Sequence, residues 1–154
     1  MKDNTIISQH YKIIICFVAQ RKRKIFQDAG VLTYFQDSIT PALREQGCEG
    51  INVLPIPTAK YAVLVELSVP IGFSGKKLEW LVKLIKKTSG EALTEHFAEL
   101  AKMRYVWAPK TWSCIGDMDD AKWRELLEFL EQDRQRLSLQ KKTGGTIINE
   151  QTLS

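Results

Sequence analysis

The side chains that could bind a metal or attack phosphorus are few and scattered. The chain has two histidines and three cysteines: His10, His96, Cys16, Cys48 and Cys114. The two histidines lie far apart in the chain, and the sequence predicts no metal site. Cys114 follows Ser113 with no histidine nearby to act as a base, so we interpret it as a structural thiol. The sequence also lacks a phosphate-binding glycine loop and a Gly-x-Ser-x-Gly elbow, and it predicts no cofactor.

The cations, by contrast, are grouped. The net charge is +4 and the pI near 9.0, which permits a nucleic-acid partner without requiring one. An unbroken basic run follows an apolar segment, and a second group recurs at helical spacing; they comprise Arg21, Lys22, Arg23 and Lys24, then Lys83, Lys86 and Lys87. Such cations can neutralise phosphates, and an exposed Tyr61, Trp107 or Trp112 could stack on a base. The alternative is that the lysines form a solvated helix face and the tryptophans belong to the core.

Length and composition indicate a single globular domain. The chain has 154 residues, of which 44% are hydrophobic and 26% charged. We expect a flexible N-terminus over 1–9, a domain over 10–138 and a flexible tail over 139–154. No apolar run reaches the roughly 18 residues of a membrane span, and the apolar segment near the start lacks the features of a signal peptide. Three distant cysteines favour a reducing, cytoplasmic location.

Hydrophobic periodicity predicts strands at 12–19, 50–57 and 60–69, with the second at an edge or irregular because of its prolines. Helices are predicted at 30–46, 76–88, 91–102 and 120–137, with a kink or split expected at Pro41. Residues 104–115 are predicted to form a short strand pair with Pro109 in the turn. The order predicts an α+β, ferredoxin-like β-α-β-β-α-β sandwich: one antiparallel sheet with helices on one face, and an added C-terminal helix. RNA-reading domains share this order but need aromatics on the third strand, where only Tyr61 occurs.

Four short sequence segments occur along the chain in the same order as in one known family. They are FVAQRKRKIF at 17–26, a helix ending in Gly47 followed by the segment 56–67, LVKLIKKTS at 81–89 and WAPKTWS at 107–113. Together they resemble the small single-tyrosine HUH transposases of minimal bacterial insertion sequences and their repeat-associated relatives. The resemblance covers about residues 11–135. It implies a protein that recognises DNA hairpins and adjacent single strands as a homodimer.

The residues that carry the family's chemistry are missing. Its paired histidines, which bind a divalent metal, align with Lys60, Tyr61 and Ala62, or one residue earlier. Its nucleophilic tyrosine aligns with Phe129, and the glutamine that completes the metal site aligns with Asp133. Phenylalanine has no hydroxyl to attack phosphorus, and no tyrosine lies on the last predicted helix. We therefore predict that cleavage activity is lost.

Three functions stay open at this stage. The first is a binder of hairpin or single-stranded DNA, with RNA possible. The second is a scaffold or protein-interaction domain, favoured by an acidic last helix that would repel nucleic acid. The third is a divergent active transposase that would use Tyr61 or Tyr105 as nucleophile, with metal ligands from Asp117, Asp119 or Asp120. A continuous face shared by 21–24 and 83–87 would favour the binder, and acidic neutralisation of those cations would favour the scaffold.

Overall fold

The computed structural model describes residues 10–72 and 75–143, with side chains described as far as Glu131. The strands are β1 (His10–Ala19), β2 (Glu49–Pro55), β3 (Ala62–Pro70) and β4 (Trp107–Ile115). The helices are α2 (Ala29–Glu45), α3 (Gly75–His96) and α4 (Asp120–Thr143), and the short 3-10 turns are η1 (Gln20–Lys22), η2 (Ile25–Gln27) and η3 (Leu100–Lys102). The chain divides into two compact units, one ending at Asp117 and the other beginning at Met118. The predicted α+β class is confirmed.

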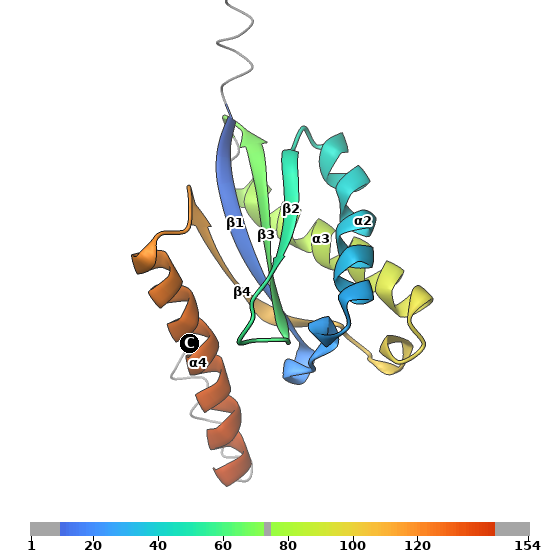
Figure 1. Ribbon diagram of the computed structural model, residues 1–154, viewed down its shortest axis with the longest axis vertical. Helices are drawn as coiled ribbons and strands as arrows, with labels where there is room; N and C mark the ends of the chain where they lie inside the picture. The colour runs from blue at the N-terminus through green and yellow to red at the C-terminus, as the bar shows by residue number, and fades with distance from the viewer. Residues whose placement is uncertain (1–9, 73–74, 144–154) are drawn as a thin grey trace, which may run out of the picture. The chain divides into compact units, whose positions relative to one another are not determined.

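The first unit is built on one four-stranded sheet in the order β2-β3-β1-β4 (Figure 1). All three pairings are antiparallel, and Ile15 of β1 lies opposite Val65 of β3 on one side and Ser113 of β4 on the other. β2 forms an edge of the sheet, as its prolines predicted, because Pro55 has no N–H to donate to a second neighbour.

The core lies between this sheet and the helices α2 and α3, which cover the same face (Figure 1). Alternate residues of the two central strands point into it, because side chains change face at every residue of a strand. Residues four positions apart on the helices complete the core from the helical side. Its members include Ile13, Ile15 and Phe17 of β1, Val63, Val65 and Leu67 of β3, Phe35 and Ile39 of α2, and Leu81 and Ile85 of α3.

The prediction of a kink or split at Pro41 is wrong in respect of the split, since α2 runs unbroken from Ala29 to Glu45. Proline removes the hydrogen bond to the carbonyl four residues earlier, which here belongs to Asp37. Both Asp37 and Pro41 are exposed. Water can therefore satisfy the free carbonyl, and the buried side of the helix keeps its hydrogen bonds.

The prediction of two helices separated at Ser89–Gly90 is also wrong. α3 is one helix from Gly75 to His96, and η3 occupies the end of the predicted second helix. Ser89 is buried, and its hydroxyl donates to the Ile85 carbonyl at 2.6 Å while accepting from Trp107 Nε1 at 3.0 Å. The serine therefore anchors the helix to β4 and does not end it.

Residues 104–115 do not form the predicted strand pair. They contain a single strand, β4, whose register against β1 shifts between Phe17 and Ala19. Pro109 lies in the irregular stretch opposite this shift, where a missing N–H removes no ladder bond. The proline thus marks a bulge within one strand.

The second unit contains α4. Asp119 caps its first turn, with Oδ1 accepting from the Lys122 amide at 2.8 Å. The helix continues to Thr143, past its predicted end at 137, so the tail predicted from residue 139 begins inside it. Residues 1–9 and 144–154 lie outside the described residues, and the predicted domain limits of 10 and 138 stay predictions. No helix in the described part of the chain has the length and apolar content needed to cross a membrane.

Candidate nucleic-acid interface

The basic run after β1 forms a strained turn on the surface. Arg21 and Lys22 both have left-handed backbone angles, with φ of 58° and 54°. This conformation costs a residue with a side chain roughly 1–2 kcal/mol. The turn is held from both ends, because the Gln20 amide donates to the Val106 carbonyl at 2.7 Å and Phe26 is buried in the core. The side chains of Arg21 and Arg23 are exposed in this turn.

Lys22 has a different role within the same run. Its Nζ lies 5.0 Å from the centre of the Tyr61 ring, which is a cation–π distance. The basic run is therefore not four equivalent phosphate contacts. Lys22 holds the turn against the start of β3, while its neighbours stay exposed.

Two hollows flank the turn. One, of about 350 Å³, is lined by the turn and by the chain that follows η3: Gln20, Arg21, Arg23, Lys102, Met103, Arg104 and Tyr105. The other, of about 370 Å³, lies beside Arg23 and Lys24 on one side and the segment 97–100 on the other. Arg23 lines both, so the two hollows adjoin.

The second basic group lies on the outer face of α3, beside a larger hollow of about 670 Å³. Its walls are the helix positions 83, 86, 87, 90, 91 and 94 and the segment 101–107. Met103, Arg104 and Tyr105 also line the hollow beside η1. The structure therefore joins the two predicted basic groups through residues 102–104, which the sequence analysis had not singled out. We call the exposed cations along this surface the basic band: Arg21, Arg23, Lys24, Lys83, Lys87, Lys102 and Arg104.

Acidic side chains do not cancel this charge. Within the described residues of the first unit, 10–72 and 75–117, no carboxylate forms an ion pair with a member of the basic band. Glu91 lines the large hollow and Glu99 the one beside Lys24, each without such a pair. The band therefore presents its positive charge to solvent.

Lys86 is set apart from the band. It is half-buried, and its Nζ donates to the carbonyls of Ala108 and Pro109 at 2.9 and 3.0 Å. These two carbonyls belong to the irregular stretch of β4, where the strand ladder is interrupted. The Lys86 ammonium therefore supplies the hydrogen bonds that a neighbouring strand would otherwise donate. Desolvation lowers its pKa. The sequence analysis grouped Lys86 with Lys83 and Lys87, and only the packing distinguishes their surroundings.

The aromatic side chains divide in the same way. Trp107 is 7% exposed, packs against Phe17, Phe26 and Phe35, and donates its Nε1–H to Ser89. The option that Trp107 stacks on a base is therefore wrong, because its ring belongs to the core. Tyr105 is 61% exposed, with the Arg104 guanidinium 5.5 Å from its ring centre. Sequence reasoning missed Tyr105 as a stacking candidate, although its place next to Arg104 in a polar connection was a usable signal.

The segment that the sequence resemblance aligns with the family's histidines is part of the scaffold. The Lys60 carbonyl accepts from the Phe26 amide at 3.0 Å, and the Tyr61 carbonyl accepts from the Ala19 amide at 2.8 Å. An ammonium, a phenol and a methyl group at Lys60, Tyr61 and Ala62 do not fit a divalent cation, which needs carboxylate, imidazole or thiolate donors. The described residues contain no group of three or more His, Cys, Asp or Glu side chains arranged to hold a metal. Phe129 lies in α4, and the Asp133 side chain falls outside the described residues.

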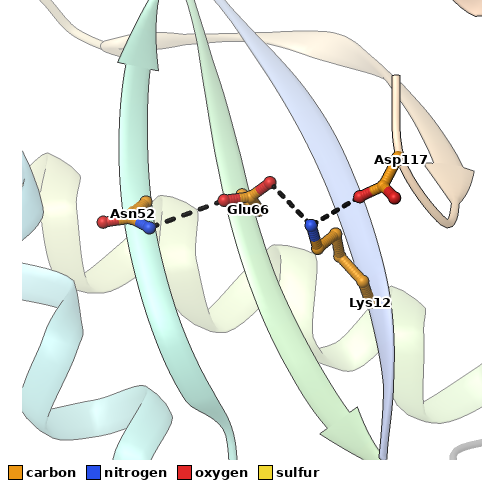
Figure 2. A network of polar contacts seen from close by, with 4 residues as sticks. All are labelled: Lys12, Asn52, Glu66 and Asp117. Atoms are coloured by element: carbon orange, nitrogen blue, oxygen red, sulfur yellow. Dashed lines mark hydrogen bonds and ion pairs between the residues drawn. The ribbon is translucent and has the colours of Figure 1, made fainter. Parts of the chain in front are cut away.

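Asp117, one of the carboxylates considered as alternative ligands, has a structural partner. Figure 2 shows Lys12 of β1 between Glu66 of β3, at 3.2 Å, and Asp117, at 2.6 Å. Asn52 Nδ2 of β2 extends this network by donating to Glu66 at 3.5 Å. The hydrogen bonds to Asp117 and Glu66 raise the pKa of Lys12. These residues alternate with core positions, so the network lies on the sheet face opposite α2 and α3.

Comparisons with known proteins agree with this fold. No family model matches the chain, and no curated protein matches it. Among solved structures, a proposed transposase from Deinococcus radiodurans R1 matches with a TM-score of 0.59 and 14% identity, over 80% of this chain and 90% of that one. The REP-associated tyrosine transposase bound to a REP hairpin matches with a TM-score of 0.48 and 15% identity, over 75% of this chain and 61% of that one. The first of these matches confirms, for the fold, the resemblance identified from the sequence.

Proposed function

We propose that this chain is a catalytically inactive, transposase-like protein that binds hairpin or single-stranded DNA through the basic band. The observation that carries this proposal is the continuity of the band, whose exposed cations have no carboxylate partners within the described residues of the first unit. Each phosphate that such a surface neutralises releases counterions and adds about 0.7–0.9 to the slope of log affinity against log salt. Binding should therefore weaken steeply as salt rises.

The strained turn supports the same proposal. Two adjacent left-handed residues with long side chains are costly, and strain of this kind collects at sites where it has a use. Glycine would fit either position at lower cost. Keeping Arg21 there is understandable if its cation contacts a ligand.

The side chains of the segment 60–62 and the contacts of nearby carboxylates support the absence of cleavage activity. Lys60, Tyr61 and Ala62 offer no metal-binding donor set, Asp117 is paired with Lys12, and Asp119 caps α4. We interpret the order of strands and helices in the first unit as that of a ferredoxin-like sandwich. Homodimer formation, RNA binding and a cytoplasmic location remain predictions from the sequence.

A protein-interaction role is the second candidate, and one observation favours it. The first turns of α4 carry exposed acids: Asp119, Asp120, Glu125, Glu128 and Glu131. Such a helix would attract a basic protein partner and repel a phosphate backbone. This role would dominate if the basic band bound no nucleic acid.

The test is fluorescence anisotropy with a labelled hairpin that carries a single-stranded flank, across a salt series. We expect binding that the double variant Arg21→Glu, Lys83→Glu weakens strongly. A matched control with the same change of net charge reverses two exposed cations outside the band, Arg44→Glu and Lys76→Glu, and should keep most of the affinity. Equal losses in both variants, or no binding by the unaltered protein at low salt, would refute the proposal. Incubation of the purified protein with single-stranded DNA and magnesium or manganese should give no nicking of the DNA.

A further inference from the structure

The large hollow beside α3 has the size and lining of a small-molecule site. Its volume of about 670 Å³ falls in the range of roughly 300–1,000 Å³ typical of ligand pockets. One wall is a face of α3 whose positions recur every three or four residues, from Lys83 to Thr94. The opposite wall contains buried Val106 and Trp107 and exposed Tyr105.

Cations and one exposed aromatic ring meet at this hollow. Lys83, Lys87 and Arg104 line it, and Tyr105 is 61% exposed, with the Arg104 guanidinium 5.5 Å from its ring centre. A ligand that satisfies these groups needs a flat aromatic system and an adjacent negative charge. A nucleotide has both, since its base can stack on a tyrosine while its phosphate contacts cations.

Glu91 adds a selective feature. It is the one carboxylate among the residues that line this hollow, and none of the cations around it forms an ion pair with it. An ionised carboxylate only accepts hydrogen bonds, through two oxygens. Guanine presents two adjacent donors, N1–H and the 2-amino group, on its Watson–Crick edge. Adenine and cytosine each place an acceptor nitrogen beside their amino group, and thymine flanks its single N–H with two carbonyls.

We propose that this hollow captures an unpaired guanine of the bound nucleic acid. Tyr105 stacks on the base, Glu91 accepts from its Watson–Crick edge, and Lys83, Lys87 and Arg104 contact the flanking phosphates. The guanine must be unpaired, because cytosine occupies the same edge in a duplex. This inference rests on the proposed function and assigns it a point of base selection that the basic band, which contacts phosphates, cannot supply.

The experiment compares five hairpins of one stem sequence: a blunt hairpin and four hairpins with a single unpaired G, A, C or T beside the stem. Anisotropy should show the G hairpin binding about tenfold more tightly than the other three, since a bidentate contact discriminates by that order. Glu91→Gln should remove most of this preference while binding of the blunt hairpin persists. Glu95→Gln changes an exposed neighbour that does not line the hollow, and it should leave the preference intact.

The stacking component has its own pair of variants. Tyr105→Ala should weaken all four unpaired hairpins, and Tyr105→Phe should restore them, because the ring and not the hydroxyl is used. Equal affinity for all five hairpins, or a guanine preference that survives Glu91→Gln, would overturn the inference while the proposed function stands. Failure of every hairpin to bind at low salt would overturn the proposed function as well.

Discussion

Two neighbouring regions of this molecule have opposite characters. The segment Lys60–Ala62 lies where the resembling family holds its metal, and its backbone is tied to Ala19 and Phe26. The basic band lies beside it, connected through the contact of Lys22 with Tyr61, and its side chains reach solvent. The first region contains no imidazole, carboxylate or thiol and serves the fold through its backbone. The second presents exposed charge in a strained turn. Neighbouring segments can thus differ in role, because one acts through its backbone and the other exposes its side chains.

The largest expected difference in stability is between two aromatic residues that line the hollow beside α3, the buried Trp107 and the exposed Tyr105. Trp107→Ala should lower the free energy of unfolding by about 3–5 kcal/mol, as for other buried aromatic residues, and it leaves Ser89 without its donor. Urea denaturation measures this loss. Tyr105→Ala, two residues away and exposed, should change stability by less than about 0.5 kcal/mol. Comparable losses in the two variants would mean that Tyr105 is also structural.

Two lysines one turn apart provide the next test. Lys86→Ala removes two hydrogen bonds from a charged donor and should cost about 1.5–3 kcal/mol of stability. Lys83→Ala should leave stability almost unchanged and reduce the salt slope of DNA binding by about 1. Thermal unfolding and anisotropy on the same preparations measure both. If Lys86→Ala left the melting temperature unchanged, its assignment as a support for the β4 bulge would be wrong.

The strained turn predicts that stability and binding change in opposite directions. Arg21→Gly should relieve left-handed strain and raise stability by about 1 kcal/mol, while it weakens binding by removing a cation. Arg23→Gly, whose φ of −67° needs no glycine, is the control and should destabilise slightly while it also weakens binding. An Arg21→Gly variant that bound with unaltered affinity would show that the strain has no role in recognition.

The smallest effect concerns the Lys12 network of Figure 2. The pKa of Lys12 is raised in the folded state, so folding favours its protonated form. This contribution is complete below the ordinary lysine pKa of 10.5 and is lost as pH rises through the folded pKa. The stability difference between the unaltered protein and Lys12→Met should therefore be smaller at a pH above the folded pKa than at a pH below 10.5. Urea midpoints at the two pH values measure it, and a constant difference would argue against the ion pairs as its source.

The buried cysteines give a chemical check on the core. Burial raises the pKa of Cys16 to about 12 and that of Cys48 to about 11. Since the thiolate is the reactive form, both should resist alkylation at pH 8 in the folded protein and react once it is unfolded. Mass spectrometry after labelling with and without urea measures this. Rapid labelling of Cys16 in the native protein would contradict its place at the centre of the sheet.

Much of the architecture could be predicted from local pattern. Apolar runs at 12–19 and 60–69 predicted the two central strands, and Pro55 predicted the edge position of β2. The errors arose where one residue type has two meanings. Ser89–Gly90 resembles a helix stop, but a buried serine can use its hydroxyl within a helix. Pro109 resembles a turn, but a bulge also tolerates a residue without an N–H.

What this sequence determined by itself was the identity of its chemical groups. No tyrosine lies in residues 120–143, and the positions that the resemblance aligns with the family's histidine pair hold other residues, because side-chain types are fixed by the sequence whatever the fold. Only the tertiary structure decided which cations act together. Residues 21–24, 83–87 and 102–104 are far apart in sequence, and they meet because β1, α3 and the connection after η3 converge at one end of the sheet. Burial also decided which of two similar lysines, and which of two nearby aromatic residues, faces solvent, since burial depends on packing partners that no local pattern contains.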